Sequence, residues 1–393
     1  MCRVALKSAV ILALLACWSP LGAQKRSTAP DFDELSAQAE QARTANRPDE
    51  AIPLYRKALS LRPSWAEGWW YLGTLLYDQD KYADAATAFR KATTLSPKVG
   101  TVWVMLGLCE YKLGREDAAL KHIQQGRRLG TIADPQLWHV MLYHEGLLLI
   151  GRAEFEKAQE TLALLARDGV ESEDLRIALG LSVLRLRPSD LPPGDSTLRQ
   201  VLLRAGHAEE LAAQEKFSEA LQEYERLTAD FPRQLNVHYA FGRFLIASRH
   251  PEPGRAVAAF QREIENFPEH VLARLGIASV KASTDPAGGL RYAEEAVKLN
   301  PYMPLGHYLL GSLLLHTDQT ARAIKELEIA RRFLPNQPRV YYALGRAYAR
   351  ANRKQDAARA RAMFKRLTEK SQQAEISSGR KGRSKPPEEN PPD

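Results

Sequence analysis

The chain has 393 residues, of which 45% are hydrophobic and 26% are charged, and its formal net charge is +8 at pH 7. These proportions are ordinary for a folded protein and exclude general disorder. The 55 basic residues are accompanied by 47 acidic ones, and such a mixed surface argues against a dedicated nucleic-acid-binding protein. We therefore expect a folded chain whose partners do not include nucleic acid.

Residues 1–23 have the composition of an export signal. A basic start is followed by an apolar segment over residues 10–18, which is too short to span a bilayer as a helix, and by small residues. We expect a signal peptide at 1–23 and a bacterial protein that is exported, either periplasmic or secreted. A second interpretation stays open, because residues 14–17 resemble a bacterial lipobox. In that case Cys17 would be lipidated and the protein would be membrane-anchored.

From Asp31 onward, apolar residues follow a helical period in successive pairs of segments. The clearest pair has Trp69, Leu72 and Gly73 on one face of a first helix, Ala85, Phe89 and Ala92 on one face of a second helix, and Pro97 after it. A polar stretch from Asp78 to Lys81 lies between the two segments and predicts a turn. Each pair is thus predicted to be two antiparallel helices.

The pair recurs with a constant period. Pro63 and Pro97, Trp69 and Trp103, Gly73 and Gly107, and Gly311 and Gly345 are each 34 residues apart. Glycine inside a helix costs about 1 kcal/mol relative to alanine, so its recurrence indicates that neighbouring helices approach closely there. This prediction covers Gly73, Gly107, Gly146, Gly242, Gly311 and Gly345.

Regularity fails between Arg187 and Gly194, where clustered prolines are incompatible with a helix. The sequence therefore predicts an N-terminal array over 31–187, a proline-rich linker or inserted loop at 188–195, and a C-terminal array over 196–370. Asp195 or Ser196 should cap the helix that follows the linker. A single continuous superhelix with one bulged connection is an equally good interpretation.

The chain ends in a basic segment and a tail of mixed charge. Between Arg353 and Lys370, seven basic residues stand against two acidic ones, as expected for a helix that caps the end of an array and faces water. Residues 371–393 are rich in Gly, Ser, Pro and charge, which predicts a disordered tail.

The spacing of the recurrent residues resembles that of the tetratricopeptide repeat family. The resemblance implies an all-α solenoid of antiparallel helix pairs, a right-handed superhelix in one or two arms, that acts as a non-catalytic scaffold or adaptor. It also implies that the first helices line a concave groove that holds proteins or peptides. On this basis, the candidate partner-binding residues are Trp70, Tyr143, Tyr239, Arg243, Tyr308, Tyr342 and Arg346. The alternative role of the aromatic members is packing between helices.

The sequence contains no pattern that predicts catalytic, cofactor-binding or metal-binding residues. His139 and His144 are five positions apart on one predicted helix and point in different directions, and Cys109 fits a small buried packing residue. We therefore expect no enzyme activity and no cofactor. Two other functions stay open: a lipid-anchored envelope assembly factor, and a binder of an anionic polymer such as a glycan through the basic C-terminal end.

Overall fold

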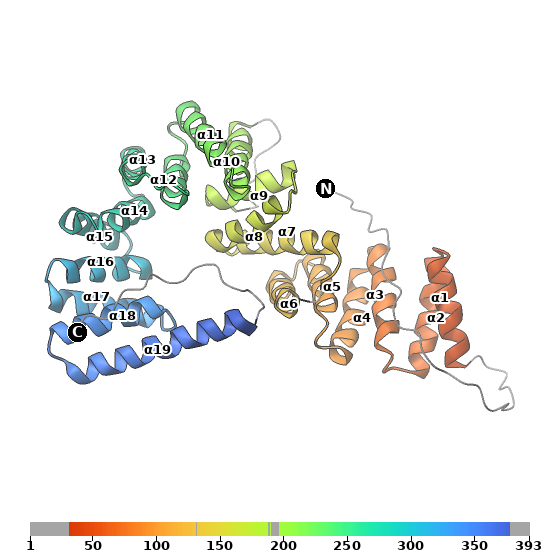
Figure 1. Ribbon diagram of the computed structural model, residues 1–393. Coiled ribbons are helices and arrows are strands. Elements are labelled where there is room, and N and C mark those ends of the chain that lie inside the picture. The colour runs from red at the N-terminus through yellow and green to blue at the C-terminus, as the bar shows by residue number, and fades with distance from the viewer. Residues whose placement is uncertain (1–30, 131, 188, 190–195, 378–393) are drawn as a thin grey trace. The chain divides into compact units, whose positions relative to one another are not determined.

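The computed structural model describes residues 31–130, 132–187, 189 and 196–377, and within them it contains only helices and turns (Figure 1). The all-α prediction is confirmed for this part of the chain. The predicted signal peptide with Cys17, all but one residue of the predicted linker, and residues from 378 onward lie outside the described residues. The helices are α1 (Phe32–Thr44), α2 (Pro48–Leu61), α3 (Ala66–Asp78), α4 (Tyr82–Leu95), α5 (Gly100–Lys112), α6 (Glu116–Leu129), α7 (Pro135–Gly151), α8 (Phe155–Arg167), α9 (Glu173–Val183), α10 (Thr197–Ala213), α11 (Phe217–Asp230), α12 (Val237–Ala247), α13 (Pro253–Asn266), α14 (Val271–Lys281), α15 (Pro286–Leu299), α16 (Pro304–His316), α17 (Thr320–Phe333), α18 (Pro338–Arg350) and α19 (Lys354–Ser377).

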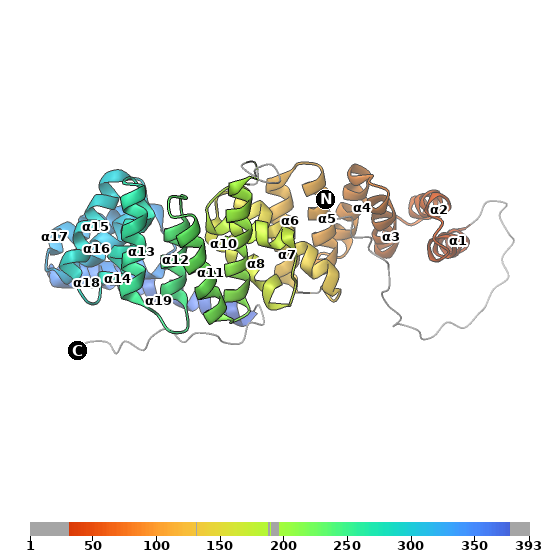
Figure 2. The same ribbon diagram turned by 90° about the horizontal axis from the view of Figure 1, so that it is seen from above.

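Contacts divide the chain into two compact units, with the boundary between Leu148 and Leu149 inside α7. The sequence predicts the division at 188–195 instead. The two positions differ because α9 and α10, which flank that segment, pack closely on each other. Within the second unit, successive helix pairs follow a curved path from α8 to α18 (Figure 1), and α10 to α14 stand side by side (Figure 2).

The backbones of α9 and α10 approach each other closely. A Cβ atom on Gly180 would stand 2.1 Å from the carbonyl oxygen of Leu202, and one on Gly206 would stand 1.7 Å from the carbonyl oxygen of Arg176. These two glycines therefore let the helices cross with their backbones in contact. The side chain of Ser196 accepts a hydrogen bond from the amide of Arg199, which confirms Ser196 as the cap of α10.

Recurrent glycines in the regular pairs make room for a large side chain of the second helix. A Cβ atom on Gly73 would lie 2.7 Å from the Phe89 ring, and one on Gly242 would lie 2.6 Å from the Phe260 ring. Gly107 and Gly311 have the same relation to Ile123 and Leu327. Gly345 differs, because a Cβ atom there would lie 3.4 Å from Cγ of Arg361, which is an ordinary contact. The prediction of close approach therefore holds at four of these positions and not at Gly345.

The turn inside most pairs uses a left-handed residue at a recurrent place. Asn46, Asp80 and Gly114 are 34 residues apart, and so are Asp318 and Asn352; φ is between 55° and 70° at all five. Asn, Asp and Gly adopt this conformation at the lowest cost. In the second unit Ala153 takes the same place with φ 58°, where its Cβ makes the conformation unfavourable.

A side-chain hydrogen bond joins each of five pairs to the proline that precedes it. The donor opens the first helix and the acceptor is a proline carbonyl six residues earlier. The bonds are Trp69 Nε1 to Pro63 at 2.8 Å, Trp103 Nε1 to Pro97 at 2.9 Å, His238 Nε2 to Pro232 at 3.0 Å, His307 Nε2 to Pro301 at 2.9 Å, and Tyr341 Oη to Pro335 at 2.8 Å. Because a carbonyl only accepts, His238 and His307 carry a proton on Nε2.

The last helix is longer than its neighbours and continues past the end of α18 (Figure 1). It reaches Ser377, whereas the sequence predicts a tail from Ser371 onward. Residues 371–377 contain neither Gly nor Pro and include Gln, Ala and Glu, which favour helix. For this reason the helix extends into the beginning of the predicted tail.

Candidate functional site

The aromatic residues predicted to line a groove lie on first helices, and three of them pack on the second helix of their own pair. The ring centroids are 5.6 Å apart for Trp70 and Phe89, 5.8 Å for Tyr239 and Phe260, and 5.6 Å for Tyr342 and Phe364. Contacts at this separation stabilise a pair by about 0.5–1.5 kcal/mol beyond the area that they bury. Each of these three side chains therefore has a packing role.

The exposure of the predicted groove residues differs from pair to pair. Tyr239 is only 7% exposed, and burial raises the pKa of its hydroxyl. Tyr308 is half-buried against the core formed by α14 to α19. Tyr143 and Trp70 are also half-buried, and the Tyr143 ring lies 5.6 Å from the His144 ring. Tyr342 is 38% exposed and is the most accessible of the five.

The two predicted groove arginines have different surroundings. Arg346 is exposed on α18, with Cζ 5.9 Å from the centroid of the Tyr342 ring, and it forms no ion pair with any described residue. Arg243 on α12 instead donates from Nη2 to Oε1 of Gln159 on α8 at 3.1 Å. Arg243 is thus committed to a contact within the chain, whereas Arg346 is available to a partner.

The contact of Arg243 belongs to a network that joins four helices of the second unit. The side-chain amide of Gln159 donates to Glu209 on α10, and the hydroxyl of Tyr224 on α11 donates to the same carboxylate. Tyr224 is fully buried, and burial raises the pKa of its hydroxyl well above the usual range. Because each polar group has a partner, this network ties α8, α10, α11 and α12 together.

A second buried network fixes the start of α12. Glu263 on α13 is fully buried and accepts the backbone amides of Asn236 at 2.7 Å and Tyr239 at 3.1 Å. It therefore replaces the side-chain cap that α12 lacks. Burial raises the pKa of this carboxyl. The sequence gives little indication of this role, because Glu263 lies 27 residues from Asn236 on another helix.

His270 completes this network from the start of α14. Its Nδ1 accepts the amide of Ala273 at 3.0 Å, so Nε2 carries the proton and donates to Oδ1 of Asn236 at 2.8 Å. Asn236 in turn donates from Nδ2 to the carbonyl oxygen of Leu184 at 2.8 Å. Burial lowers the pKa of His270 to about 4, so the ring is neutral at pH 7.

An open cleft of about 810 Å³ includes Asn236 and His270 in its wall. The other lining residues come from the start of α8, the turn after α9, the turn before α12, the end of α13 and the start of α14. Most of its wall is apolar and includes Phe155, Leu235, Phe267 and Leu272. Arg185 supplies a charge, with its guanidinium 4.7 Å above the Phe155 ring and paired with the carboxylate of Glu156. Largely apolar clefts of this size with a few polar groups are typical places for a ligand side chain.

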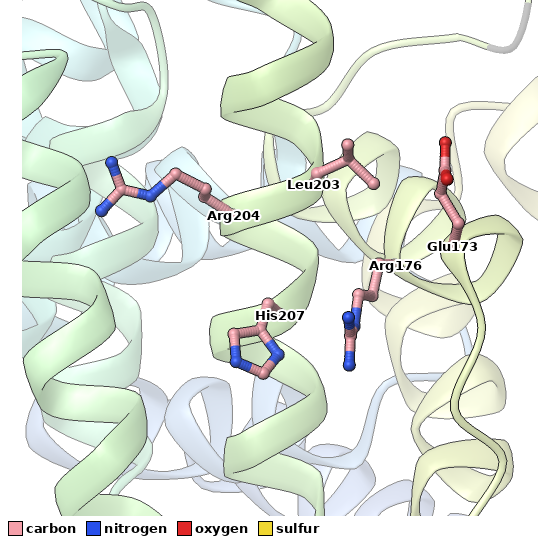
Figure 3. A pocket seen from close by; sticks show the side chains of 5 residues that line it. All are labelled: Glu173, Arg176, Leu203, Arg204 and His207. Atoms are coloured by element: carbon pink, nitrogen blue, oxygen red, sulfur yellow. The ribbon is translucent and has the colours of Figure 1, made fainter.

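A smaller pocket of about 320 Å³ lies between α9 and α10. Figure 3 shows Arg176 and His207 pointing into the same space, whereas Arg204 and Glu173 point away from it. Arg176 donates to the buried Glu210 at 2.7 Å, and Arg204 is paired with two carboxylates. The charges that line this pocket are therefore largely engaged within the protein.

Cys109 and His144 have the packing roles that the sequence indicates. Cys109 is fully buried, and burial raises the pKa of its thiol to about 12. His144 donates a hydrogen bond from Nδ1 to the carbonyl oxygen of Val140 at 2.8 Å, and burial lowers the pKa of this ring. Among the described residues, no group of three or more His, Cys, Asp or Glu side chains is placed to hold a metal ion. None of the described helices combines the length and apolarity needed to cross a membrane.

Three segments of the chain, residues 36–100, 72–131 and 279–338, match the family model described as "Tetratricopeptide repeat". These segments are tetratricopeptide repeats. Proteins built from this repeat are generally non-catalytic scaffolds for other proteins. The resemblance given by the residue spacing is thereby confirmed for residues 36–131 and 279–338.

Several solved structures are similar to this tetratricopeptide-repeat chain. A crystal structure of MamA has 17% identity and a TM-score of 0.39, covering 42% of this chain and 96% of that chain. Yeast Tom70 has 16% identity and a TM-score of 0.35, covering 85% and 69%; the APC/C hetero-tetramer Cut9-Hcn1 has 13% identity and a TM-score of 0.37, covering 88% and 89%. These low values specify no function. Comparison with curated protein sequences gives no match.

The matched tetratricopeptide repeats leave residues 132–278 unassigned. This interval contains the cleft, both buried networks and the crossing of α9 and α10. The 34-residue spacing is also least regular in this interval. In the structure, α10 packs there on both α9 and α11. The distinctive features of the chain thus lie between its two regular stretches of repeats.

Proposed function

We propose that the protein is a non-catalytic scaffold that binds peptides or partner helices along the first helices of its C-terminal pairs. The observation that carries this proposal is the exposed pair Tyr342 and Arg346 on α18. An aromatic ring beside an arginine without an ion pair offers both contact area and a charge-assisted hydrogen bond. The preferred partner is therefore a segment with an acidic side chain next to an apolar one.

The proposed binding surface extends from α18 to Tyr308 on α16. It excludes Tyr239 and Arg243, because the first is buried and the second is bonded to α8. Both Tyr239 and Tyr342 pack on the second helix of their pair, but Tyr239 is 7% exposed and Tyr342 is 38% exposed, so only Tyr342 presents its ring to a partner. A test of the scaffold function should therefore use α18 rather than α12.

Photo-crosslinking tests this surface directly. A photoreactive amino acid in place of Tyr342 should capture a partner in the cells that naturally produce the protein, and mass spectrometry identifies it. With that partner purified, Tyr342→Ala or Arg346→Gln should weaken binding by roughly tenfold or more, as for other interface hot spots. The control is Lys325→Gln, which removes an exposed charge from α17 and should leave affinity unchanged.

Unchanged affinity in both α18 variants, with circular dichroism like that of the wild type, would contradict the proposed surface. Enzymatic activity of the purified chain that a single substitution abolishes would contradict the scaffold function itself.

We also propose that the protein is exported, on the basis of residues 1–23. Cell fractionation should place it in the periplasm or the medium. If it is found in the membrane fraction and Cys17→Ala releases it, the lipid-anchored form is the correct one.

A further inference from the structure

One end of the helix stack in the second unit brings together four segments that are distant in sequence. Short turns reverse the chain after α15, α16 and α17. The ends of α15 and α17 therefore lie at the same end of the stack as the starts of α16 and α18. The hydrogen bond from His307 to the Pro301 carbonyl fixes the turn before α16, and the bond from Tyr341 to the Pro335 carbonyl fixes the turn before α18.

This end of the stack exposes four large apolar side chains, which we call the apolar edge. They are Leu299 (42% exposed), Tyr302 (78%), Leu305 (47%) and Phe333 (51%). Only ten large apolar residues are exposed in the whole described part of the chain, so four of them are concentrated in two turns. Scattered exposed residues of this kind need no explanation, whereas a group of them marks an interaction surface.

Basic residues surround the apolar edge. Lys298, Arg332 and Arg339 are exposed in the same two turns, and none of them forms an ion pair with a described residue. Acidic residues are missing from the sequence between positions 329 and 355, which includes the turn before α18. The edge therefore combines exposed apolar groups with three basic side chains that have no ionic partner among the described residues.

We propose that the apolar edge rests on an anionic lipid surface. The four side chains project from turns and helix ends. Such side chains contact a flat surface, such as a bilayer, more readily than a helix or peptide, which needs a groove. A tyrosine ring fits the boundary between headgroups and acyl chains, and lysine and arginine pair with lipid phosphates. An anionic polymer would use the charges and leave the apolar side chains in water. This surface is separate from the one proposed for peptide binding.

The proposal is tested by sedimentation of the full chain with vesicles of phosphatidylcholine alone or mixed equally with phosphatidylglycerol. We expect binding to the anionic vesicles only. Tyr302→Ser combined with Phe333→Ser should lower the binding constant by roughly tenfold or more, because two apolar side chains no longer leave water. Lys298→Gln, Arg332→Gln and Arg339→Gln should each lower it by about fivefold. The matched control is Leu61→Ser, since Leu61 ends a second helix of the first unit and is 56% exposed.

Hydrogen exchange locates the contact on the chain and separates it from any binding by residues 1–30. The amides of residues 298–306 and 331–340 should exchange more slowly with anionic vesicles present, and those of residues 60–66 should not change. Equal exchange in the presence and absence of vesicles would overturn the proposal. It would also be overturned if the Tyr302→Ser and Phe333→Ser protein bound as well as the wild type, or if soluble heparin bound with an affinity that these serines leave unchanged. The last result would identify an anionic polymer instead of lipid.

Discussion

Replacing Gly206 with alanine tests the crossing of α9 and α10. The added methyl group would stand 1.7 Å from the Arg176 carbonyl oxygen and 2.5 Å from its carbonyl carbon. Both atoms belong to the backbone of α9, so no side-chain rotation can relieve the clash. Overpacking usually costs 1–3 kcal/mol, and here a whole helix must shift. We therefore expect a loss of about 3 kcal/mol or more in the free energy of unfolding, although alanine gains about 1 kcal/mol in helix propensity.

The loss should be local, because each helix pair in such an array is stabilised mainly by its neighbours. Hydrogen exchange of the amides in α9 and α10 measures it, and urea unfolding followed by circular dichroism gives the effect on the whole unit. The matched control is Gly345→Ala, where the new Cβ lies 3.4 Å from Arg361 Cγ and should be tolerated or slightly stabilising. Wild-type exchange in α9 and α10 of the Gly206→Ala protein would refute the backbone crossing.

Three further predictions follow from single residues. His270 has a pKa of about 4 in the folded protein against 6.5 when unfolded, so its contribution is complete above pH 6.5 and is lost as pH falls towards 4. The loss should reach roughly 3 kcal/mol, and a His270→Gln protein should lack that part of the pH dependence in urea unfolding. Cys109, with a pKa raised to about 12, should resist iodoacetamide at pH 8 and react in urea, as read from its peptide by mass spectrometry; rapid alkylation of the folded protein would contradict its burial. Ala153→Gly should raise the free energy of unfolding by up to about 1 kcal/mol, because φ is 58° there; a lower melting temperature would argue against it.

The regular helix pairs could be predicted because their information is local. Residue types such as those at Gly73, Ala85 and Phe89 recur at fixed spacing along the sequence. The helix faces that carry these three residues are the buried faces of α3 and α4. The crossing of α9 and α10 could not be obtained in this way. Its signal is the pair Gly180 and Gly206, which are 26 residues apart and outside the 34-residue period.

The candidate site could be predicted only in part. Residue spacing identifies the position of Tyr239 and Tyr342 on their helices, but it does not show how much of each ring a neighbouring helix covers. Arg243 illustrates the reason, since its partner Gln159 is 84 residues away in sequence. A buried acid such as Glu263 is even harder to recognise, because a carboxylate on a helix is usually solvated and only tertiary packing makes it a cap.

The double role of α10 limits how the chain can be edited. Deleting or duplicating one 34-residue module is a standard way to shorten or lengthen a repetitive protein, and in the regular stretches both cut points fall in turns. Around α10 the same operation would leave either α9 or α11 without its companion. Insertions and fusions should therefore be made in the turns of the regular stretches, and the block from α8 to α12 should be moved only as a whole.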